Sequence, residues 1–156
     1  MTGHDYYDRD GQFGFRQTDY EVIQHIPILR ESWTISLHGV AKTTALKGGQ
    51  QIPFFLMPSL GGGTDLRGYS SWRFRDRNSL LVQAEWRIMV NRFFDTAVFY
   101  DAGKVTPHTS DLSFDGLKSD YGFGGRFHTP FATNLRIEYA RSSEGRRIIF
   151  AVGPVF

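Results

Sequence analysis

The residues Leu60-Gly61-Gly62-Gly63-Thr64-Asp65-Leu66-Arg67-Gly68-Tyr69 separate two halves of the chain that both have the pattern of β-strands. Three consecutive glycines are unfavourable inside a helix or strand, because glycine loses more backbone freedom than any other residue when it is ordered. The stretch is therefore predicted to be a loop, with Arg67-Gly68-Tyr69 as its folded-back tip. On local grounds a single arginine in such a loop is simply solvated. The flanking sequence favours another interpretation.

That flanking sequence alternates apolar and polar residues with a period of two, which indicates strands with one apolar face. In the segment 80–90, Val82, Ala84 and Trp86 share one face, while Gln83 and Glu85 share the other. Proline cannot donate a hydrogen bond to a strand ladder, so Pro27 is expected to end the first strand. We predict about seven antiparallel strands and little helix, over residues 13–26, 33–42, 80–90, 96–105, 121–129, 135–142 and 147–156.

The connections between these strands differ in length. Residues 91–95 and 130–134 are short turns, whereas 43–72 and 106–117 are long loops. Transmembrane barrels have short periplasmic turns and long extracellular loops. The polar faces also hold more charge than a soluble core accepts, because charged residues are seldom buried unless they are paired. These charged residues are Glu85, Arg87, Asp101, Arg126, Arg136 and Glu138. A lipid-facing apolar side and a wet lumen explain both features, so the sequence predicts an all-β, antiparallel transmembrane barrel.

Composition limits the alternatives. The 156 residues are enough for one domain, and the absence of cysteine excludes disulfides and thiolate metal sites. The net charge of +2 is scattered along the chain, which does not indicate nucleic-acid binding. The longest apolar run, 52–57, is far shorter than the ~20 residues of a spanning helix. It is expected to pack against another segment or to lie in a membrane interface.

The first ten residues are polar and acidic and do not resemble a signal peptide. We therefore expect either a cytosolic protein or a piece whose N-terminal part is missing. Residues 1–12 include Asp5, Asp8 and Asp10, but Tyr6 and Gln17 stand where a calcium loop needs its first and last carboxylates. A polar loop that ends in an Asp-Gly turn is predicted there instead.

We expect no catalytic, cofactor or metal site. The five histidines have no metal-ligand spacing, and their ordinary interpretation is as polar strand or loop residues. The glycine run lacks the lysine and the following helix of a phosphate-binding loop. Ser70 and Ser71 lie near the loop tip, but their surroundings do not match a nucleophile elbow. The sequence therefore does not predict an enzyme.

Several segments resemble, in order, the motifs of the bacterial surface antigen family of outer-membrane barrels. This family includes BamA-like and TamA-like assembly factors and two-partner-secretion transporters. Leu66-Arg67-Gly68-Tyr69 resembles its Val/Leu-Arg-Gly-Phe/Tyr loop tip, and Phe99-Tyr100-Asp101-Ala102-Gly103 resembles its Phe-x-Asp-x-Gly strand. Glu85-Trp86-Arg87 is similar to its Glu-Tyr-Arg strand, with tryptophan in place of tyrosine. Segments 117–127 and 135–145 resemble two further strands, and the resemblance covers roughly residues 13–156.

The resemblance implies a barrel of about sixteen strands, of which residues 1–156 supply the C-terminal part. It implies a place in the bacterial outer membrane and a part in inserting or translocating proteins there. The implied partners are the lipid bilayer, unfolded outer-membrane or secreted client proteins, and assembly-machinery proteins. Two alternatives stay open: a structural or ligand-binding surface antigen without translocation activity, and the barrel half of a lipase-fused family member.

The loop tip is expected to reach the inward face of the sheet. If the loop 43–72 folds back into the lumen, Arg67 meets Glu85 and Asp101, which share the polar side of their strands. An arginine fork suits carboxylates better than lysine does. The family resemblance implies the same pairing, with Asp101 as the principal partner. Gly68 is expected to permit a tight turn, Tyr69 to pack against Phe99, and Gly103 to leave space for the loop.

The last strand is expected to present opposite faces to lipid and lumen. Ile148, Phe150, Val152 and Phe156 align on the face assigned to lipid. Arg147, Ile149 and Ala151 alternate with them on the lumen side. The resemblance implies that Phe156, with Phe150 and Val152, forms a C-terminal assembly signal.

Overall fold

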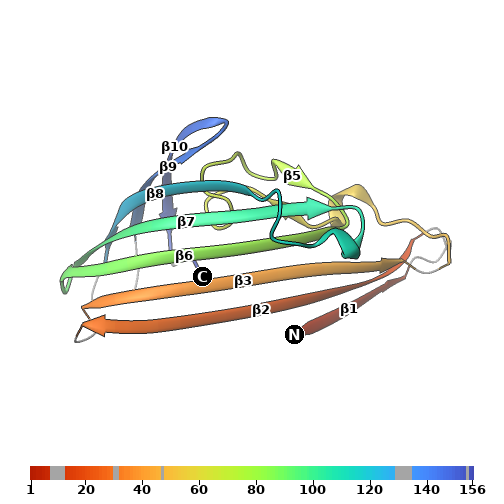
Figure 1. Ribbon diagram of the computed structural model, residues 1–156, viewed down its shortest axis with the longest axis horizontal. Helices are drawn as coiled ribbons and strands as arrows, with labels where there is room; N and C mark the ends of the chain where they lie inside the picture. Colours follow the sequence, from red (N-terminus) through yellow and green to blue (C-terminus); the bar gives the residue numbers. More distant parts are fainter. Residues whose placement is uncertain (8–12, 30–31, 47, 129–134, 154) are drawn as a thin grey trace.

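The computed structural model describes residues 1–7, 13–29, 32–46, 48–128, 135–153 and 155–156. Within these residues, eight strands form one curved antiparallel sheet, with β1 and β10 at its edges (Figure 1). Their order is β1 (Thr2–Tyr7), β2 (Gly14–Leu29), β3 (Trp33–Leu46), β6 (Asn78–Asn91), β7 (Phe94–Thr106), β8 (Lys118–Phe127), β9 (Leu135–Ser142) and β10 (Gly145–Val152). The prediction of an all-β, antiparallel architecture is confirmed.

The remaining elements lie in the two long loops. The short strands β4 (Ser59–Leu60) and β5 (Phe74–Arg75) pair with each other, and β4 contacts both β6 and β7. The segment with β5, yellow-green in Figure 1, lies beside β7. Single-turn 3-10 helices cover Phe54–Leu56 and Thr109–Asp111. No helix in the described part of the chain has the length and apolar character to cross a membrane.

The N-terminal prediction is wrong for residues 2–7, which form β1 rather than a polar loop. β1 pairs with residues 14–19 of β2, and the ring of Tyr6 stacks on that of Phe15 at a centroid distance of 4.6 Å. This aromatic contact stabilises a strand whose sequence lacks a clear apolar face. The Asp-Gly turn predicted at residues 10–11, residue 129 and the turn at 130–134 lie outside the described residues.

Two predicted strand ends also differ from the structure. β2 continues through Pro27 to Leu29, with a register shift between these residues. β1 pairs only with residues 14–19, so Pro27 stands on a free edge, where its missing N–H costs no ladder bond. β3 extends to Leu46 and takes the first four residues, 43–46, from the predicted loop.

The sheet has an apolar outer face and a polar inner face. On the outer face, large side chains are between 47% and 71% exposed: Val98, Tyr100, Tyr121, Phe123, Ile148 and Phe150. On the inner face, polar side chains are at most 2% exposed: Gln83, Glu85, Asp101, Arg126, Arg136 and Glu138. The predicted facing of these strands is confirmed. This distribution is the reverse of a soluble domain and is typical of a membrane barrel.

Small residues on the inner face leave room for larger neighbours. A Cβ atom added to Gly122 would lie 2.4 Å from Cζ of Phe99 and 2.0 Å from the carbonyl oxygen of Tyr139. Its absence lets the Phe99 ring extend over β8, where it packs with Ala140 and Ile149 in a buried apolar cluster. The sheet therefore offers a flat aromatic surface in the middle of its polar face.

The apolar run 52–57 is only partly packed. Ile52 is buried, whereas Phe54 and Phe55 are 69% and 75% exposed. Packing against other segments therefore accounts for the two ends of the run but not for its middle. A place in the membrane interface stays a prediction for Phe54 and Phe55.

Phe156 lies away from the face predicted for it. β10 ends at Val152, and the Phe156 ring stacks on inward-facing His38 at a centroid distance of 4.8 Å. Its ring is also parallel to that of His25 at 6.5 Å. The period-two extrapolation fails here because the strand has already ended, whereas Ile148, Phe150 and Val152 do point outward.

The two faces can be tested at neighbouring residues in the middle of β2. Val22 points outward and Ile23 points to the lumen beside His38, and both are well exposed. In lipid vesicles we expect Val22→Arg to lower the free energy of unfolding by about 2–4 kcal/mol, and Ile23→Arg by much less. Urea titration measures both. Equal losses would contradict the assignment of the outer face to lipid.

Candidate functional site

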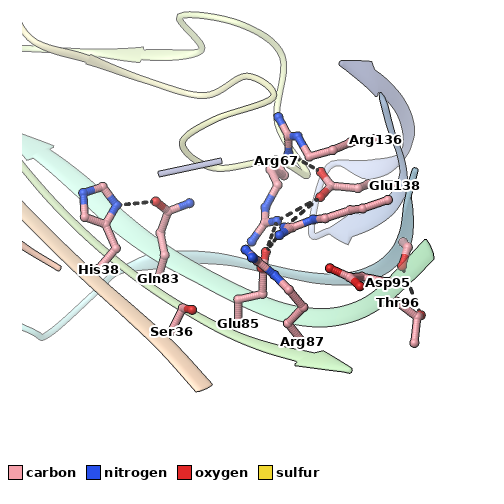
Figure 2. A network of polar contacts seen from close by, with 12 residues as sticks. Ser36, His38, Arg67, Gln83, Glu85, Arg87, Asp95, Thr96, Arg136 and Glu138 are labelled. Carbon is pink, nitrogen blue, oxygen red and sulfur yellow. Dashed lines mark hydrogen bonds and ion pairs between the residues drawn. The ribbon is translucent and has the colours of Figure 1, made fainter. Parts of the chain in front are cut away.

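The tip of the long loop inserts Arg67 into the inner face of the sheet. Its side chain is 0% exposed. Nε donates to Oδ2 of Asp101 at 2.7 Å, and Nη2 donates to Oδ1 of the same carboxylate at 2.8 Å. Nη1 donates to Glu85 at 3.2 Å and to Glu138 at 3.4 Å. Figure 2 shows Arg67 reaching toward Glu85 and Glu138. One guanidinium therefore connects the loop to β6, β7 and β9.

An aromatic ring completes the guanidinium site. The Cζ atom of Arg67 lies 3.3 Å from the centroid of the Phe99 ring. This stacking adds a cation–π contact to the carboxylate bonds. The prediction that Tyr69 packs against Phe99 is wrong, because Arg67 occupies that ring face. Tyr69 instead meets the edge of Phe74, with ring centroids 5.0 Å apart.

Further arginines surround the same carboxylates. Glu85 also accepts hydrogen bonds from Arg87 and Arg126, and Glu138 accepts one from Arg136 at 2.9 Å. We call the set Arg67, Glu85, Arg87, Asp101, Arg126, Arg136 and Glu138 the lumen charge cluster. Buried charges are tolerated when each has partners of opposite sign. Each acid of the cluster is ion-paired with at least one arginine, so the inner wall accommodates the Arg67 guanidinium without an unpaired carboxylate in the set.

The electrostatics keep Arg67 charged. Burial alone would lower the pKa of the Arg67 guanidinium, but the hydrogen bonds and charge of Asp101, together with Glu138 and Glu85, raise this pKa above its ordinary value. The charge state of Arg67 is therefore fixed over the whole physiological pH range.

The backbone beside Arg67 fits closely against β8 and β9. A Cβ atom on Gly68 would lie 2.5 Å from Cβ of Asp120. The Gly68 carbonyl accepts a hydrogen bond from Oγ of Ser142 at 2.9 Å, and the Tyr69 hydroxyl donates to the carbonyl of Ser119 at 3.1 Å. Only a glycine permits this approach, so Gly68 contributes space rather than chemistry.

The rest of the tip is held from β6 and β7. Nε2 of Gln83 lies 2.8 Å from the carbonyl of Asp65 and 3.1 Å from that of Thr64. Leu66 is fully buried in an apolar cluster with Leu60, Tyr69 and Leu81. Gly103 borders this cluster, and an added Cβ there would lie 3.0 Å from Cδ1 of Leu60. Gly103 therefore leaves the room that the loop occupies.

The structure thus brings Leu66, Arg67, Gly68 and Tyr69 to the sheet beside Asp101, Glu85, Phe99 and Gly103. Sequence reasoning missed the direct contact of Glu138 with Arg67 and the supporting contacts of Gln83 and Ser142. The sequence pattern predicts that Glu138 points inward, but its distance from Arg67 depends on how strongly the sheet curves. Phe150 and Val152 remain on the outer face, away from this site.

The lumen charge cluster is an ion-pair site. All of its acids are within reach of arginine. Among the described residues, no group of three or more histidine, aspartate or glutamate side chains is placed to hold a metal ion. The chemistry of this donor set is recognition of a guanidinium by carboxylates.

The comparisons with known proteins concern the family and the fold. Residues 8–154 match the Omp85 superfamily domain. No curated protein matches the sequence significantly. Among solved structures, BamA from Haemophilus ducreyi lacking POTRA domains 1–3 is similar, with a TM-score of 0.73 and 18% identity. The match covers 91% of this chain and 34% of that one, so the chain spans about a third of the BamA structure.

The family match covers nearly the whole chain and the fold agrees, so the predicted relationship to BamA-like outer-membrane barrels is confirmed. The chain belongs to the Omp85 superfamily, and its location is the bacterial outer membrane.

Proposed function

We propose that this chain is the C-terminal part of an outer-membrane barrel that inserts or translocates other proteins, and that Arg67 locks the long loop to the inner wall. The proposal that Arg67 fixes the loop rests on one observation: the Arg67 guanidinium is fully buried and is bound by carboxylates from three different strands. Family membership supports the activity. The client proteins and assembly partners are unfolded outer-membrane or secreted chains and the machinery that delivers them.

The free sheet edges support a larger barrel. β1 and β10 stand at opposite edges and are not paired with each other in the described residues. In lipid, each unsatisfied backbone group at an edge costs several kcal/mol, so membrane strands close into barrels. Further strands, which bring the barrel to about sixteen, would satisfy both edges.

A fixed loop gives the lumen a defined shape. The segment from 48 to 77 would otherwise be a long chain with a high conformational entropy. Binding of Arg67 ties its tip to β6, β7 and β9, while Gly68 and Tyr69 tie it to β8 and β9. We propose that this lock keeps the strands of the half-barrel in register while a client passes or inserts.

The activity is tested with the natural full-length protein in vesicles. Unfolded outer-membrane protein is added, and its folding is followed by the change in gel mobility on heating. We expect faster folding than in protein-free vesicles. A folding rate equal to that in protein-free vesicles would favour a structural or ligand-binding barrel instead.

Removal of the lock should weaken the barrel. We expect Arg67→Ala and Asp101→Ala each to lower stability, by about 3–5 kcal/mol if the site is fully dry and by less if water enters. The double variant should be no worse than the worse single variant, because both remove the same pair. Arg67→Lys should restore only part of the loss, since lysine cannot make the two-pronged contact.

Arg73 provides a matched control in the same loop. It pairs with Glu144 at 2.9 Å, but both side chains are well exposed, and such surface pairs contribute little. Arg73→Ala should therefore leave urea denaturation almost unchanged. Additive losses for Arg67→Ala and Asp101→Ala, or an equal loss for Arg73→Ala, would argue against a buried lock.

The close approach of the loop backbone can be tested separately. A methyl group on Gly68 would overlap Asp120, so Gly68→Ala should displace the tip and slow barrel assembly. Gly39→Ala is the control, because an added Cβ there meets nothing within 4 Å. Pulse-chase measurement of heat-modifiable protein compares the two. Normal assembly of Gly68→Ala would show that the tip does not dock against β8.

A further inference from the structure

A groove crosses the outer face of the sheet near its long-loop end. Gly39, Val82 and Ala102 are cross-strand neighbours on β3, β6 and β7, and they form its floor. Tyr100 borders the groove, and Phe114 and Leu117 from the loop 107–117 also line it. The cavity volume is about 500 Å³. This is within the range of about 300–1,000 Å³ that holds small ligands.

The depth of the groove follows from the small floor residues. A Cβ atom on Gly39 would point into open space, with no atom within 4 Å. Ala102 is on the outward side of β7 but is only 5% exposed. The larger outward side chains of Leu37 and Tyr100 border these floor residues, so the floor is a local recess in a surface that faces lipid.

A lysine stands beside the groove. Lys104 follows Ala102 on the same face of β7, and its ammonium group donates to Oγ of Ser113 at 3.0 Å and to the carbonyl of Asp115 at 3.1 Å. These bonds hold the residues on both sides of Phe114. Both acceptors are uncharged, so neither neutralises the ammonium. A half-buried lysine at the end of a membrane strand suits a phosphate at the headgroup level.

We propose that the groove binds an acyl chain of an anionic phospholipid, with the lipid phosphate at Lys104. The outer-membrane location puts lipid against this face, and the ammonium group of Lys104, bonded on both sides of the groove residue Phe114, would select the head group. The site lies on the opposite side of the sheet from the lumen charge cluster. It is therefore independent of the proposed protein-insertion activity.

Native mass spectrometry tests the site. The natural full-length protein is stripped of lipid in detergent and titrated with phosphatidylglycerol. Gly39→Trp fills the recess, and Lys104→Gln removes the charge. We expect each to weaken retention of phosphatidylglycerol by about tenfold, or 1.4 kcal/mol. Lys104→Arg should retain the lipid, and diacylglycerol with the same chains should bind the unaltered protein more weakly than phosphatidylglycerol.

Val98→Trp is the matched control for Gly39→Trp, because it adds an indole to the outer face of β7, outside the groove. It should retain phosphatidylglycerol normally. Heat-modifiability confirms that each variant is folded, and Gly39→Leu replaces Gly39→Trp if the larger side chain prevents assembly.

Three results would overturn the assignment. Equal retention by the Gly39 variant and by Val98→Trp would show that lipid does not occupy the groove. Unchanged retention in Lys104→Gln would remove the phosphate contact. Stronger retention of an acylated phosphosugar lipid than of phosphatidylglycerol would exclude a phospholipid as the preferred ligand.

Discussion

Burial of one guanidinium constrains the whole inner face of the sheet. Arg67 has no exposed surface, and a charge removed from water is stable only with excellent partners. Asp101, Glu85 and Glu138 supply them from three strands, and the Phe99 ring supplies a flat surface beneath. These groups can meet only when the strands keep their register and the sheet keeps its curvature. The position of the loop tip therefore depends on the register and curvature of the sheet, and the buried tip in turn stabilises that geometry.

The reversed polarity of the sheet makes this arrangement possible. In a soluble domain, the inner face would need apolar side chains, and its charged residues would be a large cost. Here lipid covers the apolar side, so the inner side is free to carry arginines paired with carboxylates. Gly122 and Gly68 remove the two steric obstacles, since one admits the Phe99 ring and the other admits the loop backbone. The charged site can therefore form only because the apolar face of the sheet is the one that meets lipid.

The two faces of the sheet could be predicted from the sequence, because each side chain of a strand points to one of only two faces. The faces of β6 to β10 follow from counting residues by two. The meeting of Arg67 with Asp101 and Glu85 follows only if the loop also folds back into the lumen, and the family resemblance implies the same pairing. Contacts that depend on the curvature of the sheet could not be predicted in this way.

Glu138 reaches Arg67, and Tyr69 turns to Phe74 instead of Phe99, because the sheet bends and side chains compete for space. Phe156 departs from the pattern because β10 ends at Val152. β1 was missed because its pairing depends on contacts such as Tyr6 with Phe15 rather than on an apolar face.

Hydrogen–deuterium exchange in membranes tests most directly whether the loop tip is held in the lumen. In the structure, the Tyr69 amide donates to the Leu66 carbonyl at 3.1 Å, and the Arg67 amide donates to the Asp101 carboxylate at 3.4 Å. Residues 62–69 should therefore exchange as slowly as the neighbouring strand β7, although they lie in a loop. Residues 113–116 of the loop 107–117, which lie outside its 3-10 helix and outside the strands, provide an internal reference that should exchange quickly. Exchange of 62–69 as fast as that reference would contradict a locked tip.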